Sequence, residues 1–119
     1  MFKIKASSNS PAVNFDSSSN CLSIIGRSIQ ENPQAWYADL WSKIEAEINM
    51  GSIMKLRLAF EYFNTASAKQ IYRLLQQFRE NTNELEIIWV YETDDEDMKE
   101  AGEDYQEMLE SHFTFEILD

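Results

Sequence analysis

The chain has 119 residues, of which 44% are hydrophobic and 13% aromatic, and its formal net charge is −11 at pH 7. This composition excludes an intrinsically disordered acidic protein, because such chains lack the aromatic side chains that build a core. The length fits one domain, and we expect residues 1–119 to form it, with residues 1–10 loosely held. A single cysteine and a single histidine exclude a disulfide framework and a multi-histidine metal site. The sequence therefore predicts neither a metal nor a cofactor.

The acidic charge is concentrated in the last third of the chain. The segment from Glu84 to Asp119 contains 14 acidic residues and one basic residue, a charge of −13. Trp, Tyr, Phe and Met residues lie in the same segment, which indicates a folded acidic surface whose charge serves either solubility or the docking of a basic partner. Nucleic acid and anionic membranes are poor partners for this charge. Without an apolar run of about 18 residues or a signal peptide, we expect a cytoplasmic protein.

Two short β-prone segments precede the first helix. Val13–Asp16 and Cys21–Ile25 flank a Ser-Ser-Ser-Asn turn, which predicts a β-hairpin that ends at Gly26. Asn32–Pro33 combines an N-cap residue with proline at the first helical position. Apolar residues at helical spacing extend this predicted helix to Asn49–Gly51.

Two strands and a helix follow. Met54–Tyr62 alternates between apolar and mostly polar residues, which predicts a strand. Asn64 and Thr65 are both N-cap residue types, and they precede a helical apolar stripe that reaches Phe78. Glu84–Glu92 has apolar residues on both faces, which predicts a central strand covered on both sides.

The C-terminal part predicts one more helix and one more strand. Asp94–Asp97 opens the helix, where acidic residues complement the helix dipole, and Phe113–Ile117 is the last strand. The predicted order is β-β-α-β-α-β-α-β. This alternation indicates a single α/β domain with a mixed sheet whose parallel strands are joined by right-handed crossovers.

The sequence does not predict an enzyme. It contains no P-loop, no G-x-S-x-G and no G-x-G-x-x-G motif. The contiguous acids of Asp94–Asp97 lack the alternating ligands and central glycine of a calcium loop. The informative segment is Tyr62–Lys69, a strand-to-helix junction whose hydroxyl groups would lie beside free helical N–H groups. Such a junction is an ordinary N-cap, or a place where an attached phosphate is stabilised.

Three blocks of the sequence resemble the SiaC family of small bacterial regulatory phosphoproteins. The first contains Val13–Asp16, Gly26–Ile29 and Glu31–Asn32. The other two, which are more specific, are Phe60–Thr65 with Ser67 and Lys69, and Tyr91–Met98 with Ala101–Tyr105. The sequence departs from the family pattern at Gln30, where proline is expected, and at Ala66 and Ala68, where serines are common. Ser67 is thus the only other hydroxyl group in the loop.

The resemblance implies a non-catalytic switch with STAS-like fold and logic. Thr65 matches the threonine that a dedicated protein kinase phosphorylates and a PP2C-type phosphatase restores. The unphosphorylated form binds and activates a diguanylate cyclase, which raises cyclic di-GMP and promotes biofilm formation. The candidate partner-binding residues are Arg27, Glu61, Tyr62, Asn64, Ser67, Lys69, Asp94 and Asp95.

Two other functions remain open at this point. One is an anti-anti-sigma-like module that binds an anti-sigma kinase, and the other is a small acidic metal-binding protein. Co-purification of a cyclase or of a sigma-pathway kinase would separate the first alternative from the cyclase activator. Calorimetry with calcium and magnesium would test the second.

Overall fold

The computed structural model describes residues 2–82 and 84–118. Within them, strands and helices alternate after an initial β-meander. The strands are β1 (Lys3–Ile4), β2 (Ala12–Asp16), β3 (Cys21–Ser28), β4 (Lys55–Phe63), β5 (Glu86–Glu92) and β6 (Phe113–Leu118). The helices are α1 (Pro33–Glu47), α2 (Thr65–Asn81) and α3 (Glu96–Leu109), with a short 3₁₀ turn at Met50–Ser52. The predicted single α/β domain with a mixed sheet is confirmed.

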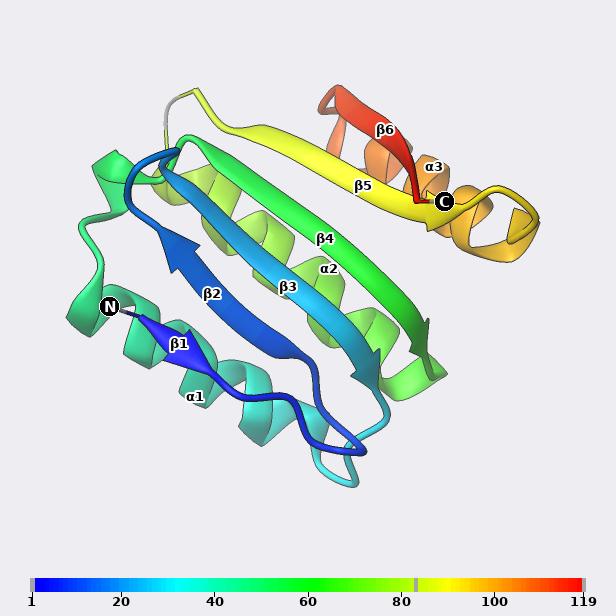
Figure 1. The fold of residues 1–119 in the computed structure, drawn as a ribbon, viewed down its shortest axis with the longest axis horizontal. Helices are drawn as coiled ribbons and strands as arrows, with labels where there is room; N and C mark the ends of the chain where they lie inside the picture. Colours follow the sequence, from blue (N-terminus) through cyan, green and yellow to red (C-terminus); the bar gives the residue numbers. More distant parts are fainter. Residues whose placement is uncertain (1, 83, 119) are drawn as a thin grey trace.

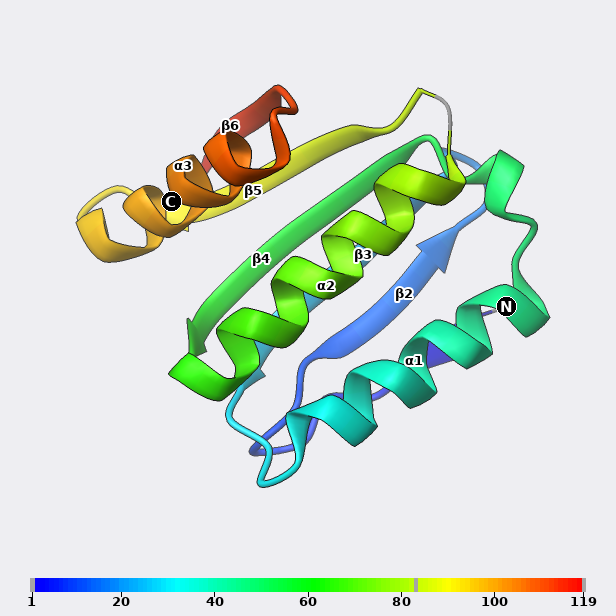
Figure 2. The ribbon, with the colours of Figure 1, turned by 180° about the vertical axis from the view of Figure 1, so that it is seen from behind.

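The strands lie in the sheet in chain order, from β1 to β6. β1, β2 and β3 pair antiparallel, and β3, β4, β5 and β6 pair parallel. The three parallel connections, β3 to β4, β4 to β5 and β5 to β6, each run to the neighbouring strand on the same side. Parallel crossovers are almost always right-handed, so the helices of these three connections are expected on the same face of the sheet. Figures 1 and 2 show α1, α2 and α3 together on that face, which leaves the opposite face of the sheet without a helix.

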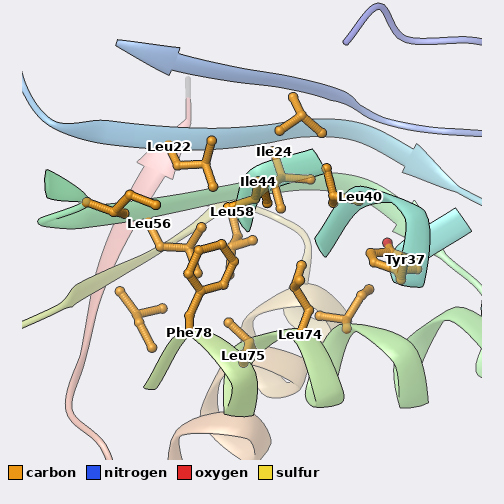
Figure 3. Close-up of a cluster of buried hydrophobic side chains, with 14 of the residues drawn as sticks. Leu22, Ile24, Tyr37, Leu40, Ile44, Leu56, Leu58, Leu74, Leu75 and Phe78 are labelled. Carbon is orange, nitrogen blue, oxygen red and sulfur yellow. The ribbon is translucent and has the colours of Figure 1, made fainter. Parts of the chain in front are cut away.

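The main core lies between the sheet and the helices α1 and α2. Figure 3 shows side chains from β3 and β4 pointing toward side chains from both helices. The fully buried members with the largest side chains here include Leu22, Ile24, Leu40, Ile44, Leu56, Leu58, Leu74, Leu75 and Phe78. They come from alternate strand positions and from helical positions three or four residues apart, as the sequence periodicity predicts.

The predicted end of the hairpin at Gly26 is wrong, because β3 continues to Ser28. The pairing of β3 with β4 shifts register between Gly26 and Arg27, where Gly26 has a φ of 129°. A glycine inside a strand often marks a bulge of this kind rather than a strand end. The bulge carries Arg27 and Ser28 onward to the carboxyl edge of the sheet.

At the N-terminus, β1 is a strand that the sequence does not predict; it pairs with β2, and Phe2 beside it is buried.

β5 is not the central strand covered on both sides that its sequence predicts. It lies next to the edge strand β6, and helices cover only one of its faces. Ile88 and Val90 lie on the other face and are nevertheless buried. Their register partners include Arg57 on β4 and Glu116 on β6, whose side chains form an ion pair of 2.8 Å across β5. The long side chains of the neighbouring strands therefore cover the apolar side chains that a second helix layer would otherwise cover.

Candidate functional site

The sequence-predicted site residues lie along one edge of the sheet. Arg27 is near the end of β3, and Glu61 and Tyr62 are near the end of β4. Thr65 begins α2, and Asp94 and Asp95 lie in the connection from β5 to α3. β3, β4 and β5 are parallel, so their carboxyl ends share this edge, which is where ligands and partners of α/β sheets commonly bind.

Asn64, and not Thr65, is the N-cap of α2. Its side-chain oxygen accepts a hydrogen bond of 2.9 Å from the backbone N–H of Ser67. Thr65 is the first helical residue, and its side chain is exposed. The first N–H groups of a helix have no partner within the helix, and the helix dipole is positive at this end. An anionic group on Thr65 would therefore lie beside stabilising donors without displacing the cap.

Ser67 is enclosed in a buried polar cluster. Its side chain is 0% exposed, and its hydroxyl oxygen lies 3.0 Å from that of Ser28 on β3. The Ser28 hydroxyl lies 2.7 Å from the Tyr37 hydroxyl on α1 and donates to Gln30 Oε1 at 2.9 Å. Burial raises the pKa of Tyr37 well above its ordinary value, so this phenol stays protonated. The cluster holds the first turn of α2 against β3 and α1.

Gln30, where the family pattern has proline, is part of this cluster. Its Oε1 also accepts a hydrogen bond of 3.3 Å from Ser67. The side chain thus joins the segment after β3 to the first turn of α2, a contact that proline has no group to make. The sequence singled out Gln30 only because the family pattern has proline there, and it did not identify Tyr37 as a residue near the site. The tyrosine carries no local signal, because it meets Ser28 only in the folded chain.

The remaining candidate residues are accessible. Arg27, Glu61, Lys69 and Asp94 are exposed, and Tyr62 exposes 53% of its surface. Lys69 follows Thr65 by four positions in the same helix, so the two side chains share a face. In the described part of the chain Lys69 belongs to neither of the ion pairs, which are Lys43–Asp39 and Arg57–Glu116. Its ammonium group is therefore available to a phosphate on Thr65.

Asp95 has a structural role as the N-cap of α3. Its carboxylate accepts a hydrogen bond of 3.0 Å from the backbone N–H of Met98.

Among residues 2–82 and 84–118, no group of three His, Cys, Asp or Glu side chains is arranged to hold a metal ion. The same residues contain no helix with the length and hydropathy that a membrane span requires.

Two residues of the third family-like block hold α3 in place, Tyr105 against α2 and Gly102 against β5. The Tyr105 hydroxyl donates a hydrogen bond of 2.8 Å to the backbone oxygen of Ala68, in the first turn of α2. Gly102 packs against the indole of Trp89, whose Nε1 donates to the backbone oxygen of Met98 at 2.9 Å. These contacts explain why a glycine and a tyrosine stand at these two positions of α3.

Replacing the N-cap of α2 tests how the phosphoacceptor is held. We expect Asn64→Ala to lower the free energy of unfolding by about 1 kcal/mol, because the N–H of Ser67 loses its acceptor. Asn64→Asp keeps a side-chain acceptor at this position and is expected to retain wild-type stability. Urea unfolding followed by circular dichroism measures both changes. Equal stability of Asn64→Ala and the wild type would contradict the capping role.

Comparisons with known proteins match nearly the whole chain. The model of a family described as SiaC family regulatory phosphoprotein matches residues 4–118. One similar structure is that of the diguanylate cyclase SiaD in complex with its activator SiaC, from Pseudomonas aeruginosa. A chain of this complex superposes on the present chain with a TM-score of 0.81 at 22% sequence identity. The superposition covers 99% of this chain and 100% of that one.

Two further structures of SiaC have the same fold. SiaC of Pseudomonas aeruginosa superposes with a TM-score of 0.72 at 23% identity, over 98% of this chain and 96% of that one. Apo-SiaC from the same organism gives 0.71 at 23% identity, over 99% and 98% of the two chains. No curated protein sequence matches the chain.

Proposed function

Because the chain belongs to the SiaC family of regulatory phosphoproteins, we propose that it is a non-catalytic cytoplasmic switch for a diguanylate cyclase. The unphosphorylated form binds and activates the cyclase. A dedicated kinase phosphorylates Thr65 and blocks this binding, and a PP2C-type phosphatase reverses the block. The observation that carries the proposal is the exposed hydroxyl of Thr65 at the first position of α2, on the edge that also presents Glu61 and Tyr62.

The proposed switch acts at the surface and leaves the fold intact. A phosphate on Thr65 adds about −1.5 to −2 charges at neutral pH. The helix dipole favours that charge by roughly 0.3–1 kcal/mol, and Lys69 adds an attraction on the same helical face. A cyclase seated on this edge would have to remove water from a phosphate whose charge the single ammonium group of Lys69 offsets only in part. Such burial costs more than 1.4 kcal/mol, which corresponds to a loss of affinity of at least about tenfold.

Cyclic di-GMP production by the cyclase of the same organism tests this proposal. We expect the unphosphorylated chain and Thr65→Ala to activate the cyclase, and the phosphorylated chain to need at least about tenfold higher concentration for the same effect. The melting temperature of the phosphorylated chain is the control, and it is expected to equal or exceed that of the unphosphorylated chain. The proposal fails if no form activates the cyclase or if phosphorylation leaves activation unchanged. A large fall in melting temperature would replace surface blocking with unfolding.

The acidic surface predicts a salt-dependent association. Residues 92–104 contribute much of the −13 charge of the last 36 residues and are proposed to attract a basic partner. The Debye length falls from about 10 Å at 0.1 M salt to about 3 Å at 1 M. We therefore expect the association rate with the cyclase, measured by stopped flow, to fall as salt rises. A rate indifferent to salt would assign these charges to solubility alone.

A further inference from the structure

The sheet divides into two parts toward its carboxyl edge. β4 and β5 pair only from Lys55–Leu58 to Glu86–Trp89. Beyond this point β4 stays paired with β3 as far as Phe63, and β5 stays paired with β6 as far as Leu118. Figures 1 and 2 both show β5 diverging from β4 in this direction. The facing edges of residues 59–63 and 90–92 are consequently not joined by ladder hydrogen bonds, and we call the opening between them the β4–β5 wedge.

Aromatic rings on the helix side hold the wedge open. The ring of Trp89 on β5 lies 6.1 Å from that of Phe60 and 6.4 Å from that of Phe63, both on β4. Tyr105 of α3 adds a ring 5.5 Å from Trp89 and 6.3 Å from Phe63. The rings of Trp89, Phe60 and Tyr105 are buried and that of Phe63 is partly buried, so closing the strands toward each other here would cost these packing contacts. The wedge is therefore a built feature of the fold.

A hollow of about 230 Å³ lies at the wedge. Ala59 and Val90 line it and alternate along their strands with the core residues Phe60 and Trp89, so the hollow opens on the uncovered face of the sheet. Ala59, Val90, Ile25 and Leu118 contribute apolar surface to it, and the last two expose 46% and 49% of their area. The carboxylate-bearing residues Glu61, Glu92 and Asp95 also line the hollow, whereas its lining in the described chain contains no Lys or Arg. The hollow thus combines an apolar floor with negative charge at its rim.

We propose that the β4–β5 wedge binds the cyclase through a segment in which an apolar side chain is flanked by lysine or arginine. This proposal rests on the function proposed above. The apolar side chain occupies the hollow, and the basic groups pair with the carboxylates of Glu61, Glu92 and Asp95. The unpaired strand edges offer backbone hydrogen bonds to an extended segment, in the manner of strand addition. Charge complementarity favours a basic partner over an acidic or neutral one.

The wedge also accounts for the effect of a distant phosphate on binding. Thr65 begins α2, which Figure 2 shows on the helix side of the sheet, whereas Ala59 and Val90 place the hollow on the opposite face. Both lie at the carboxyl edge, because Glu61 lines the hollow and the chain reaches Asn64 three residues later. A cyclase anchored in the wedge must extend past this edge, where a phosphate on Thr65 obstructs it. We expect the kinase to need Thr65 and not the hollow, because the hydroxyl group that it modifies lies outside the hollow.

Two substitutions in the wedge and one outside it test the proposal. Ala59→Arg fills the hollow with a cationic side chain, and Glu92→Lys reverses one charge at the exposed rim. We expect each to weaken binding of the intact chain to the cyclase at least about tenfold in calorimetry, while kinase-catalysed phosphorylation of Thr65 continues. Glu84→Lys makes the same charge change at an exposed position outside the hollow and is expected to stay within about twofold of the wild type.

The outcomes separate the wedge from the proposed function. If the wild-type chain does not bind the cyclase, the proposed function fails. If the wild type binds and both wedge variants bind equally well, the wedge proposal is overturned and the function stands. Hydrogen exchange of the complex provides a second measurement that needs no variant. Protection of residues 59–63 and 90–92 on binding is expected, and protection confined to the helices would overturn the proposal.

Discussion

Incubation with the cognate kinase and ATP is expected to place one phosphate on Thr65, and Thr65→Ala is expected to abolish the modification. Thr65 is exposed, whereas Ser67 is buried and hydrogen-bonded to Gln30 and Ser28. Exposing a buried hydroxyl and leaving its partners unsatisfied costs about 1–3 kcal/mol. That cost alone favours Thr65 by a factor of about 5 to 150. Peptide mass mapping after the reaction distinguishes the two residues.

Ser67→Ala is the matched control for this prediction. It removes the second hydroxyl group of the loop, and phosphorylation of Thr65 is expected to continue in this variant. Thr65→Ala is expected to stay folded, with a change in unfolding free energy within about 0.5 kcal/mol, because Asn64 provides the cap. Phosphate found mainly on Ser67, or on a residue outside 62–69, would show that Thr65 is not the phosphoacceptor.

Local sequence patterns predicted the elements well where one face of an element is buried. The period-two alternation in β4 and the cap signals at Asn32 and Asn64 are reproduced in the structure. The sequence pattern gave a wrong prediction where one residue type is typical of two different local structures. Gly26 is typical of a strand end and also of a bulge, and only the register with β4 decides between them. A two-residue strand such as β1 is too short to show any period.

The candidate site was predictable only in part, for a similar reason. The sequence identified Thr65 and Ser67 as the two hydroxyl groups of the loop, but their difference in burial comes from Ser28 and Tyr37, which are distant in the chain. The wedge was not predictable. It requires that the pairing of β4 with β5 stop at Leu58, which depends on how rings from different elements pack.

The second large effect is expected at Gly102, in the middle of α3. A Cβ atom at this position would lie 2.6 Å from Nε1 and 2.7 Å from Cγ of Trp89, closer than packed atoms approach. The indole is fully buried and held by its hydrogen bond to Met98, so it has no space into which to move. Alanine in a helix interior would ordinarily gain about 1 kcal/mol over glycine. Overpacking costs about 1–3 kcal/mol, and contacts this short place the cost toward the upper end of that range, above the gain.

Gly102→Ala is therefore expected to destabilise the protein by up to about 2 kcal/mol, measured by urea unfolding. Gly51→Ala, in the 3₁₀ turn, is the control for a Gly→Ala change without a clash, because its Cβ would meet only Asn49 Oδ1, at 3.4 Å. In a Trp89→Phe background the smaller ring relieves the clash, so adding Gly102→Ala is expected to cost less than it does in the wild type. A double variant that loses less stability than the sum of the two single variants indicates two side chains that occupy the same space. If the two changes in unfolding free energy are additive, the cost of Gly102→Ala arises in the backbone of α3 and not from a clash with Trp89. The glycine of the family-like block Ala101–Tyr105 would then have another cause.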